Sequence, residues 1–202
     1  MSDAQIFGDS ELFHGLEDET LGFPPACPLT ASTDDQQPMP FFILADDAFP
    51  LRNYLMKPYG TRGMSREERI FNYRLSRGRR VVENAFGILA NRWRCFLKTL
   101  EQKPDTVRDM VEAAVVLHNL LRQRHPGLAA QEVDREDDNG NFIPGTWRDQ
   151  VDWVDVDQPR ASRNSARADG KHHRNLLKAF FNSQQGKMYN MQISKFTVKS
   201  LM

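Results

Sequence analysis

Apolar residues at the start of the chain recur at helical spacing, and a single apolar run follows a loop. Over residues 3–16 the spacing predicts one short helix or two helical turns. Residues 22–40 contain five prolines and a polar cluster, which is typical of a surface loop. The run FFILA (41–45) then predicts a short strand, which is buried on both faces if it lies inside a sheet. Pro50 and the segment KPYGTRG (57–63) are predicted to end the extended part.

The strongest helical pattern lies at residues 65–98. Ser65 followed three residues later by Glu68 fits the capping box that starts many helices. Gly78 lies in the middle of the pattern, where it would divide or kink the helix. Apolar residues at steps of three, four or seven predict one buried stripe along this helix, formed by Phe71, Leu75, Val82, Phe86, Leu89, Trp93 and Phe96.

A second long helix is predicted to begin near Pro104, which suits a first-turn position, and to end at RHPG (124–127). His118 is interpreted as a core-facing histidine with a hydrogen-bond partner. The broad apolar face of this helix consists of Val107, Met110, Val111, Ala114, Val115, Leu117 and Leu121.

The periodicity disappears after the second helix. Three regions are therefore predicted: one domain over residues 1–125, an acidic and polar flexible arm over 126–170, and a short terminal helix with a tail over 171–202.

Charge is unevenly distributed, although its formal sum is zero. Residues 66–98 contain eight Arg and one Lys against three Glu, a net of +6, whereas residues 131–160 contain nine acids against three Arg, a net of −6. The basic segment is the better guide to a partner, and the acidic one is typical of a solvated arm.

The composition excludes several other classes of protein. Cys27 and Cys95 form no CxxC pair, which disfavours zinc and a disulfide framework and favours a reduced intracellular compartment. The chain has no apolar run long enough to span a membrane, and no signal peptide is indicated. RLSRGRR (74–80) is a weak candidate nuclear signal, so the predicted location is nuclear, cytoplasmic or both.

Three acids are candidates for chemistry. Asp46 and Asp47 directly follow the predicted strand, and Glu83 lies on the long helix one turn after Arg79 and Arg80. Acids at a strand end and on a facing helix are expected ligands of catalytic divalent metals. The alternative interpretation is that the aspartates are an ordinary turn pair and that Glu83 pairs with Arg79 or Arg80.

Two motifs carry a resemblance to a known family. ILADDAFPL (43–51) and VVENAFGILANRWRCF (81–96) resemble the DDE nuclease domain of PIF/Harbinger-type transposases and their domesticated relatives. Supporting matches are FNYRLSRGRRVVE (71–83), AAVVLHNLL (113–121) and SDAQIF (2–7).

This resemblance implies an α/β, RNase H-like DDE nuclease fold that is incomplete here and therefore mostly helical. It implies a DNA endonuclease that uses Mg²⁺ or Mn²⁺, with Asp46 and Glu83 as catalytic metal ligands and Asp3 as a further metal-associated carboxylate. DNA and a Myb-like protein are the implied partners. The side chains expected to contact DNA phosphates are Arg74, Arg77, Arg79, Arg80, Arg92 and Arg94.

The chain departs from the family pattern at two points. Ala45 stands where the family has glycine, and no strand-borne aspartate followed by Gly-Thr-His is found. The sequence is therefore expected to correspond to the C-terminal part of the domain and to have absent or reduced activity. The alternatives are a non-catalytic remnant that binds DNA or protein, and an interaction protein built on a helical hairpin. The acidic segment could also screen the basic helix when DNA is absent.

Overall fold

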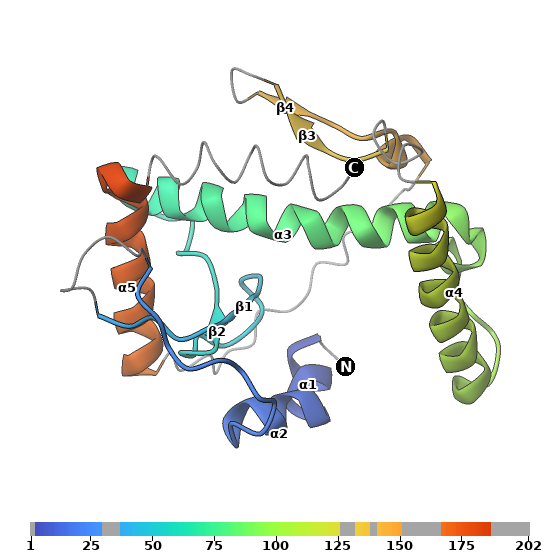
Figure 1. Cartoon of the computed structure of the whole chain (residues 1–202), viewed down its shortest axis with the longest axis horizontal. Coiled ribbons are helices and arrows are strands. Elements are labelled where there is room, and N and C mark those ends of the chain that lie inside the picture. Colours follow the sequence, from blue (N-terminus) through green and yellow to red (C-terminus); the bar gives the residue numbers. More distant parts are fainter. Residues whose placement is uncertain (1–2, 30–36, 126–131, 138–140, 151–166, 187–202) are drawn as a thin grey trace. The chain divides into compact units, whose positions relative to one another are not determined.

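The computed structural model describes residues 3–29, 37–125, 132–137, 141–150 and 167–186. These residues are mostly helical with a few very short strands, as the sequence predicted. The chain forms two compact units, Met1–Arg79 with Val156–Asn190 and Arg80–Asp155 with Met191–Met202. Helix α3 (Arg66–Arg92) passes from the first unit into the second (Figure 1).

The first unit begins with two short helices, α1 (Asp3–Gly8) and α2 (Glu11–Glu17). Ser10 caps α2, because its hydroxyl accepts a hydrogen bond from the backbone N–H of Phe13 at 3.2 Å. The ring of Phe7 packs edge-on against Phe13 and Phe49, with centroids 5.5 Å apart in each pair. The predicted helical segment is thus two separate helices joined by a capping serine.

Two strands form the sheet of the first unit. β1 (Ile43–Leu44) pairs in parallel with β2 (Leu55–Met56), with Ile43 opposite Leu55 and Leu44 opposite Met56. β1 lies within the predicted run, but it is only half-buried, whereas both residues of β2 are buried. β2 was not predicted, since two residues are too few to show a strand periodicity.

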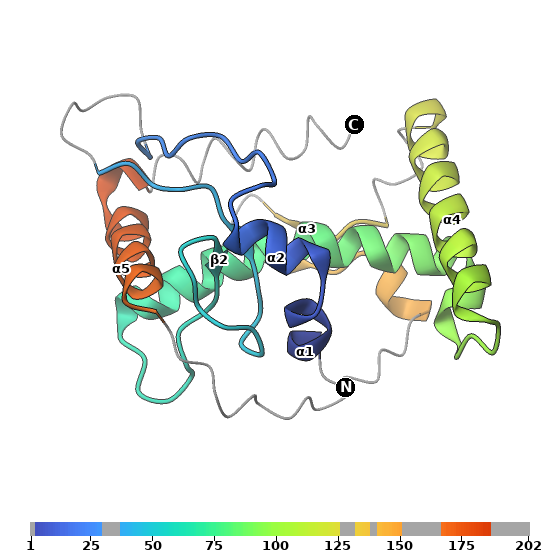
Figure 2. The same cartoon turned by 90° about the horizontal axis from the view of Figure 1, so that it is seen from below.

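The core of the first unit joins the sheet to α3 and to α5 (Ala168–Asn182), which confirms the predicted terminal helix. Helix α5 lies beside the first turns of α3 in both views (Figures 1 and 2). The buried side chains of this core are Met39, Leu51, Met56, Phe71, Leu75 and Leu177.

Helix α3 begins with the predicted capping box. The backbone N–H of Glu68 donates to Ser65 Oγ at 3.2 Å, and the backbone N–H of Ser65 donates to Glu68 Oε2 at 3.0 Å. The helix runs without a break through Gly78, so the predicted division there is wrong. A Cβ atom at Gly78 would lie 2.5 Å from Leu44 Cδ1, and glycine therefore allows β1 to approach the helix closely.

The predicted apolar stripe of α3 is only half correct. Phe71 and Leu75 are buried, whereas Val82 and Phe86 are 55% and 61% exposed. In the second unit the buried residues of α3 include Asn84 and Ile88 instead. At 100° per residue these lie on the opposite side of the helix from Val82 and Phe86.

A β-hairpin covers the buried side of α3 in the second unit (Figure 1). β3 (Arg135–Glu136) pairs antiparallel with β4 (Phe142–Ile143), and a 3₁₀ helix, η3 (Thr146–Gln150), follows. Trp147 is buried, and a Cβ atom at Gly87 would lie 2.5 Å from its Cδ2 atom. The sequence predicted a flexible arm here, so this ordered hairpin differs from that expectation.

After α3 the chain forms a short 3₁₀ helix, η1 (Arg94–Leu97), and then α4 (Pro104–Arg124), which crosses the end of α3 (Figures 1 and 2). Pro104 occupies the first turn, and the helix ends where predicted. Ala114 and His118 are the buried residues of α4. Most of its predicted apolar face is exposed instead, namely Val111, Val115, Leu117 and Leu121.

Candidate active site

Asp46 follows β1 directly and forms a tight turn. Its Oδ1 atom accepts a hydrogen bond from the backbone N–H of Ala48 at 2.8 Å, and its carbonyl oxygen accepts one from Phe49 at 3.4 Å. An aspartate that bonds the backbone two residues on is the usual Asx turn. The turn fixes the direction of the half-buried Asp46 carboxylate at the end of the strand.

Asp47 is tied to the other strand. Lys57, the residue after β2, lies with its Nζ atom 3.2 Å from Asp47 Oδ1, and it donates to the carbonyl oxygens of Asp47 and Phe49 at 2.8 and 2.9 Å. The Lys57 side chain is largely buried and the Asp47 side chain is exposed. Both aspartates thus make turn or ion-pair contacts, which matches the alternative that the sequence left open.

Glu83 lies on α3 in the second unit, and its side chain is 47% exposed. Its Oε2 atom lies 3.8 Å from Nη2 of Arg148, a residue of η3 that the sequence did not single out. Arg80, one of the partners considered from the sequence, is paired with Glu136 at 3.1 Å. The helix therefore presents the Glu83 carboxylate toward solvent, beside a guanidinium group of the hairpin.

Asp134 holds Arg148 in place. Arg148 donates from Nε to Asp134 Oδ1 at 2.9 Å and from Nη2 to Oδ2 at 2.6 Å. The Asp134 side chain is fully buried, and its Oδ1 atom also accepts a bond from the backbone N–H of Gly145 at 2.8 Å. The hydrogen bonds that Arg148 donates to Asp134 raise the pKa of Arg148, so the guanidinium stays charged.

Asn84, the neighbour of Glu83, fastens the hairpin to α3. Its Oδ1 atom accepts hydrogen bonds from Trp147 Nε1 at 2.8 Å and from the backbone N–H of Asp134 at 3.0 Å. These buried bonds fix the hairpin against the turn of helix that carries Glu83. In the sequence, the only signals for this contact were an asparagine within the long basic helix and a tryptophan in the acidic segment.

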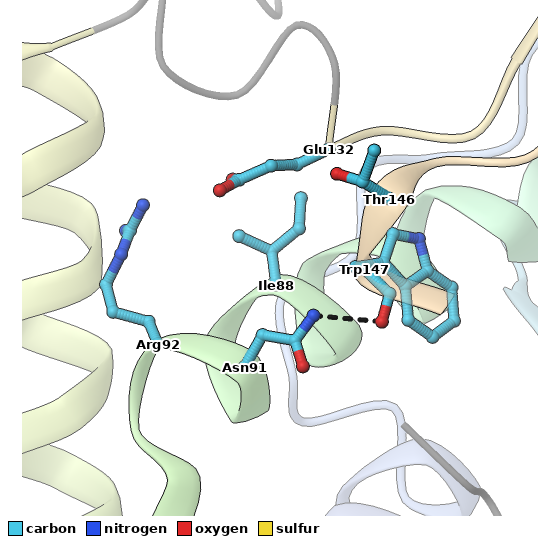
Figure 3. Close-up of a pocket in the computed structure, with 6 residues that line it drawn as sticks. All are labelled: Ile88, Asn91, Arg92, Glu132, Thr146 and Trp147. Atoms are coloured by element: carbon cyan, nitrogen blue, oxygen red, sulfur yellow. Dashed lines mark hydrogen bonds between the residues drawn. The ribbon is translucent and has the colours of Figure 1, made fainter. Parts of the chain in front are cut away.

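A small pocket lies beside Trp147 on the same unit (Figure 3). Its volume is about 190 Å³. Asn91 Nδ2 donates to the Trp147 carbonyl oxygen at 2.9 Å, as the dashed line in Figure 3 shows. Asn91 Oδ1 and Glu132 Oε2 are buried without a hydrogen-bond partner in the described residues. The pocket is lined by Ile88, Asn91, Arg92, Glu132, Thr146 and Trp147.

Arg74 and Arg80, both expected to contact DNA, have partners within the protein. Arg74 donates to the carbonyl oxygen of Gly186 at 3.1 Å and lies 5.0 Å from the ring centre of Phe181, and burial lowers its pKa. The Arg80 guanidinium, already paired with Glu136, lies 4.8 Å from the ring centre of Phe142. Contact with DNA would therefore require these two side chains to leave their present partners.

The other four arginines are spread over α3 and η1. Arg92 lies with Nη1 3.4 Å from His118 Nδ1, and His118 is buried as predicted. Arg77 lies 5.8 Å from the ring centre of Tyr73. Arg79 is half-buried and Arg94 is exposed. DNA contact by these residues stays a prediction.

The three predicted metal ligands are carried by different elements. Asp46 belongs to the first unit and Glu83 to the second, while Asp3 is the first residue of α1 and its side chain lies outside the described part of the structure. Carboxylate oxygens are the donors that Mg²⁺ and Mn²⁺ prefer, so the chemistry of these side chains fits a hard divalent cation. Within the described ranges, no three His, Cys, Asp or Glu side chains gather at one point suited to a metal.

Comparison with known proteins identifies the family to which the chain belongs. The family model described as DDE superfamily endonuclease matches residues 1–119, which is more than half of the chain. The chain belongs to this family. A nuclease family implies DNA as the substrate, and such nucleases generally use divalent metals. No curated protein and no solved structure matches the chain.

The match places the candidate acids within the family region. Asp46 and Glu83 lie between residues 1 and 119, whereas Asp134 and Arg148 lie beyond it. As for membranes, none of the helices in the described ranges has the length and apolar character to cross one.

Proposed function

We propose that this chain is a PIF/Harbinger-type, transposase-derived endonuclease with an RNase H-like fold, which hydrolyses DNA phosphodiester bonds with Mg²⁺ or Mn²⁺. One observation carries the proposal. The region that matches the endonuclease family contains one carboxylate at a strand end, Asp46, and one exposed on a helix, Glu83. These are the two kinds of position from which carboxylates converge on a catalytic cation.

In this proposal Asp46 and Glu83 hold the divalent cation, and Asp3 is a further carboxylate near it. Such a cation, when bound, would supply a more acidic attacking water and stabilisation of charge on the phosphate oxygens. The Asx turn keeps the Asp46 carboxylate pointing in one direction, so less ordering is needed on binding.

Contacts with the DNA backbone are assigned in this proposal to the arginines of α3 and η1. Of the predicted set, Arg94 is exposed and Arg79 is half-buried, whereas Arg74 and Arg80 have contacts within the protein that DNA binding would have to replace. Backbone contacts of this kind position the nucleic acid and weaken with salt. A Myb-like partner protein and a nuclear or cytoplasmic location belong to the same proposal.

We expect the 202-residue chain on its own to cleave DNA weakly or not at all. It carries Asp46 and Glu83, but no strand-borne Asp-Gly-Thr-His sequence. The second candidate function is a domesticated, non-catalytic module that binds DNA or protein. The position of Arg148 favours it, since a positive guanidinium lies 3.8 Å from the Glu83 carboxylate without any metal.

Cation binding tests the proposal directly. Mn²⁺ is titrated into the full chain and followed by calorimetry or by electron paramagnetic resonance. Asp46→Asn and Glu83→Gln should each weaken Mn²⁺ binding by at least about tenfold. Removing a residue that only supports a metal ligand already costs about 10–100-fold in metal affinity, and a ligand itself should cost no less. Asp47→Asn is the matched control, because it removes the neighbouring exposed carboxylate, and it should have little effect.

Equal Mn²⁺ binding by all four proteins would contradict the metal assignment. A plasmid-nicking assay with Mg²⁺ or Mn²⁺ then addresses activity. Nicking that is lost on Glu83→Gln would contradict the expected inactivity but support the nuclease. Salt-dependent DNA binding that survives Asp46→Asn, without any Mn²⁺ binding, would favour the non-catalytic module.

A further inference from the structure

The Arg148 guanidinium lies beside Glu83 but is not held by it. The distance of 3.8 Å between Arg148 Nη2 and Glu83 Oε2 is too long for a hydrogen bond. Both side chains are partly exposed, at 37% and 47%. An ion pair of this length and exposure contributes little to stability, so it does not explain why the arginine is at this position.

Other groups fix the guanidinium firmly. Asp134 binds its Nε and Nη2 atoms in the two-pronged arrangement typical of Arg–carboxylate pairs. The Cζ atom of Arg148 also lies 4.2 Å from the ring centre of Trp147 and 5.7 Å from that of Phe142. The buried carboxylate and the two rings hold the guanidinium from the protein side, while part of the side chain still faces solvent next to Glu83.

A charged, immobilised guanidinium next to a candidate metal ligand is suited to binding a phosphate group. Arginine donates several N–H bonds in a rigid fork that matches the oxygens of a phosphate group. The bonds to Asp134 use Nε and Nη2, which leaves the Nη1 atom outside this pair. A phosphate held beside the Glu83 carboxylate would lie next to this guanidinium, whose Nη2 atom is 3.8 Å from Glu83 Oε2.

We propose that Arg148 is a phosphate-binding residue of the Glu83 site and contacts the backbone of the bound nucleic acid. The inference rests on the proposed function for the role of Glu83. It goes beyond the family match, because Arg148 lies outside residues 1–119. The β3–β4 hairpin then has a function of its own, which is to carry this arginine to the helix.

The salt dependence of DNA binding tests the proposal. Affinity of the full chain for a fluorescent duplex oligonucleotide is measured over a series of KCl concentrations, with and without Mn²⁺. Arg148→Gln should weaken binding and reduce the magnitude of the slope of log K against log salt by about 0.9, the value for one phosphate contact. Arg148→Lys should keep the slope but bind less tightly, because it keeps the charge and loses the fork.

Arg135→Gln is the matched control, since it removes the same charge from an exposed position in the same hairpin. It should leave the slope unchanged. If Arg148→Gln and Arg135→Gln have the same effect, or if Arg148→Gln has none, the proposal is wrong.

Arg148→Gln alone leaves the buried Asp134 carboxylate without its partner, and this could disturb the fold. A second variant therefore distinguishes the loss of a DNA contact from a folding defect. In Asp134→Asn/Arg148→Gln both members of the pair are neutral and can still form hydrogen bonds. Near-ultraviolet circular dichroism reports whether the buried Trp147 keeps its environment. Weak binding with the lower slope and an unchanged spectrum supports the proposal, and restored binding overturns it.

The outcomes also separate this inference from the proposed function. If Glu83→Gln abolishes Mn²⁺ binding while Arg148→Gln leaves DNA binding unchanged, the inference alone fails. If Glu83→Gln leaves Mn²⁺ binding unchanged while Arg148→Gln lowers the salt slope, the metal assignment alone fails and Arg148 remains a phosphate contact.

Discussion

The buried carboxylate of Asp134 lies 2.6 Å from Nη2 of Arg148, and it also accepts a hydrogen bond from the backbone N–H of Gly145. Asp134→Ala removes the bonds from Arg148 and from Gly145, and it leaves the Gly145 N–H buried without a partner. We expect a loss of about 2 kcal/mol in the free energy of unfolding, measured with urea. Asp105→Ala is the control, because Asp105 is 91% exposed in a surface pair with Arg108 and should cost less than about 0.5 kcal/mol. Equal losses in the two variants would show that the buried pair does not stabilise the hairpin.

Gly87 allows Trp147 to approach the helix, so Gly87→Ala should destabilise the second unit. Alanine alone would favour the helix by about 0.5–1 kcal/mol. The methyl group would meet the indole ring at 2.5 Å or less, however, and such overpacking costs about 1–3 kcal/mol. The expected result is a net loss of stability with a changed near-ultraviolet spectrum of Trp147. Gly8→Ala on α1, where a Cβ atom meets nothing within 4 Å, should be neutral or slightly stabilising.

In the second unit the buried face of α3 is opposite to the predicted one, so truncating one residue on each face tests which face is buried. Ile88 is 3% exposed, and Ile88→Ala should cost about 2–4 kcal/mol in the free energy of unfolding. Phe86 is 61% exposed, and Phe86→Ala should cost about 0.5 kcal/mol or less, although it removes the larger side chain. A greater loss for Phe86→Ala would mean that the stripe predicted from the sequence is buried after all.

His118 should make stability depend on pH. Burial lowers its pKa, and the positive charges of Arg92 and Arg122 lower it further. Below the unfolded-state pKa of about 6.5, the unfolded chain therefore binds a proton that the folded chain does not, and stability falls as the pH decreases toward the folded-state pKa. Urea unfolding at about pH 7.5 and about pH 5.5 should show a smaller drop for His118→Asn than for the wild type. Equal drops would exclude a contribution from this side chain.

Local signals were sufficient for the long helices. The Ser65–Glu68 capping box and Pro104 mark the starts of α3 and α4, because caps and first-turn prolines act within a few residues. The strand before Asp46 was also predicted, from the apolar run at residues 41–45. The candidate acids came from the motif around them, and periodicity alone left their roles open.

Contacts between distant residues were not predictable in this way. The hairpin is anchored by Asn84 and Gly87 on α3 and by Trp147, and the two helix residues are polar or small. A hydrophobic pattern treats such residues as exposed, so it assigned the wrong face of α3 to the core in the second unit. Arg148 was missed for the same reason, since its position depends on a buried aspartate in a segment that has no periodicity.

The close approach of Trp147 to Gly87 has a consequence for how this sequence can change. A bulkier residue at position 87 is compatible with the hairpin only if the side chain at position 147 becomes smaller. The two positions should therefore be substituted together, and the double change Gly87→Ala/Trp147→Leu should cost less than the sum of the single changes. Evolutionary substitution at position 87 is thus restricted by the residue at position 147, and the reverse holds as well, although the two are far apart in the sequence.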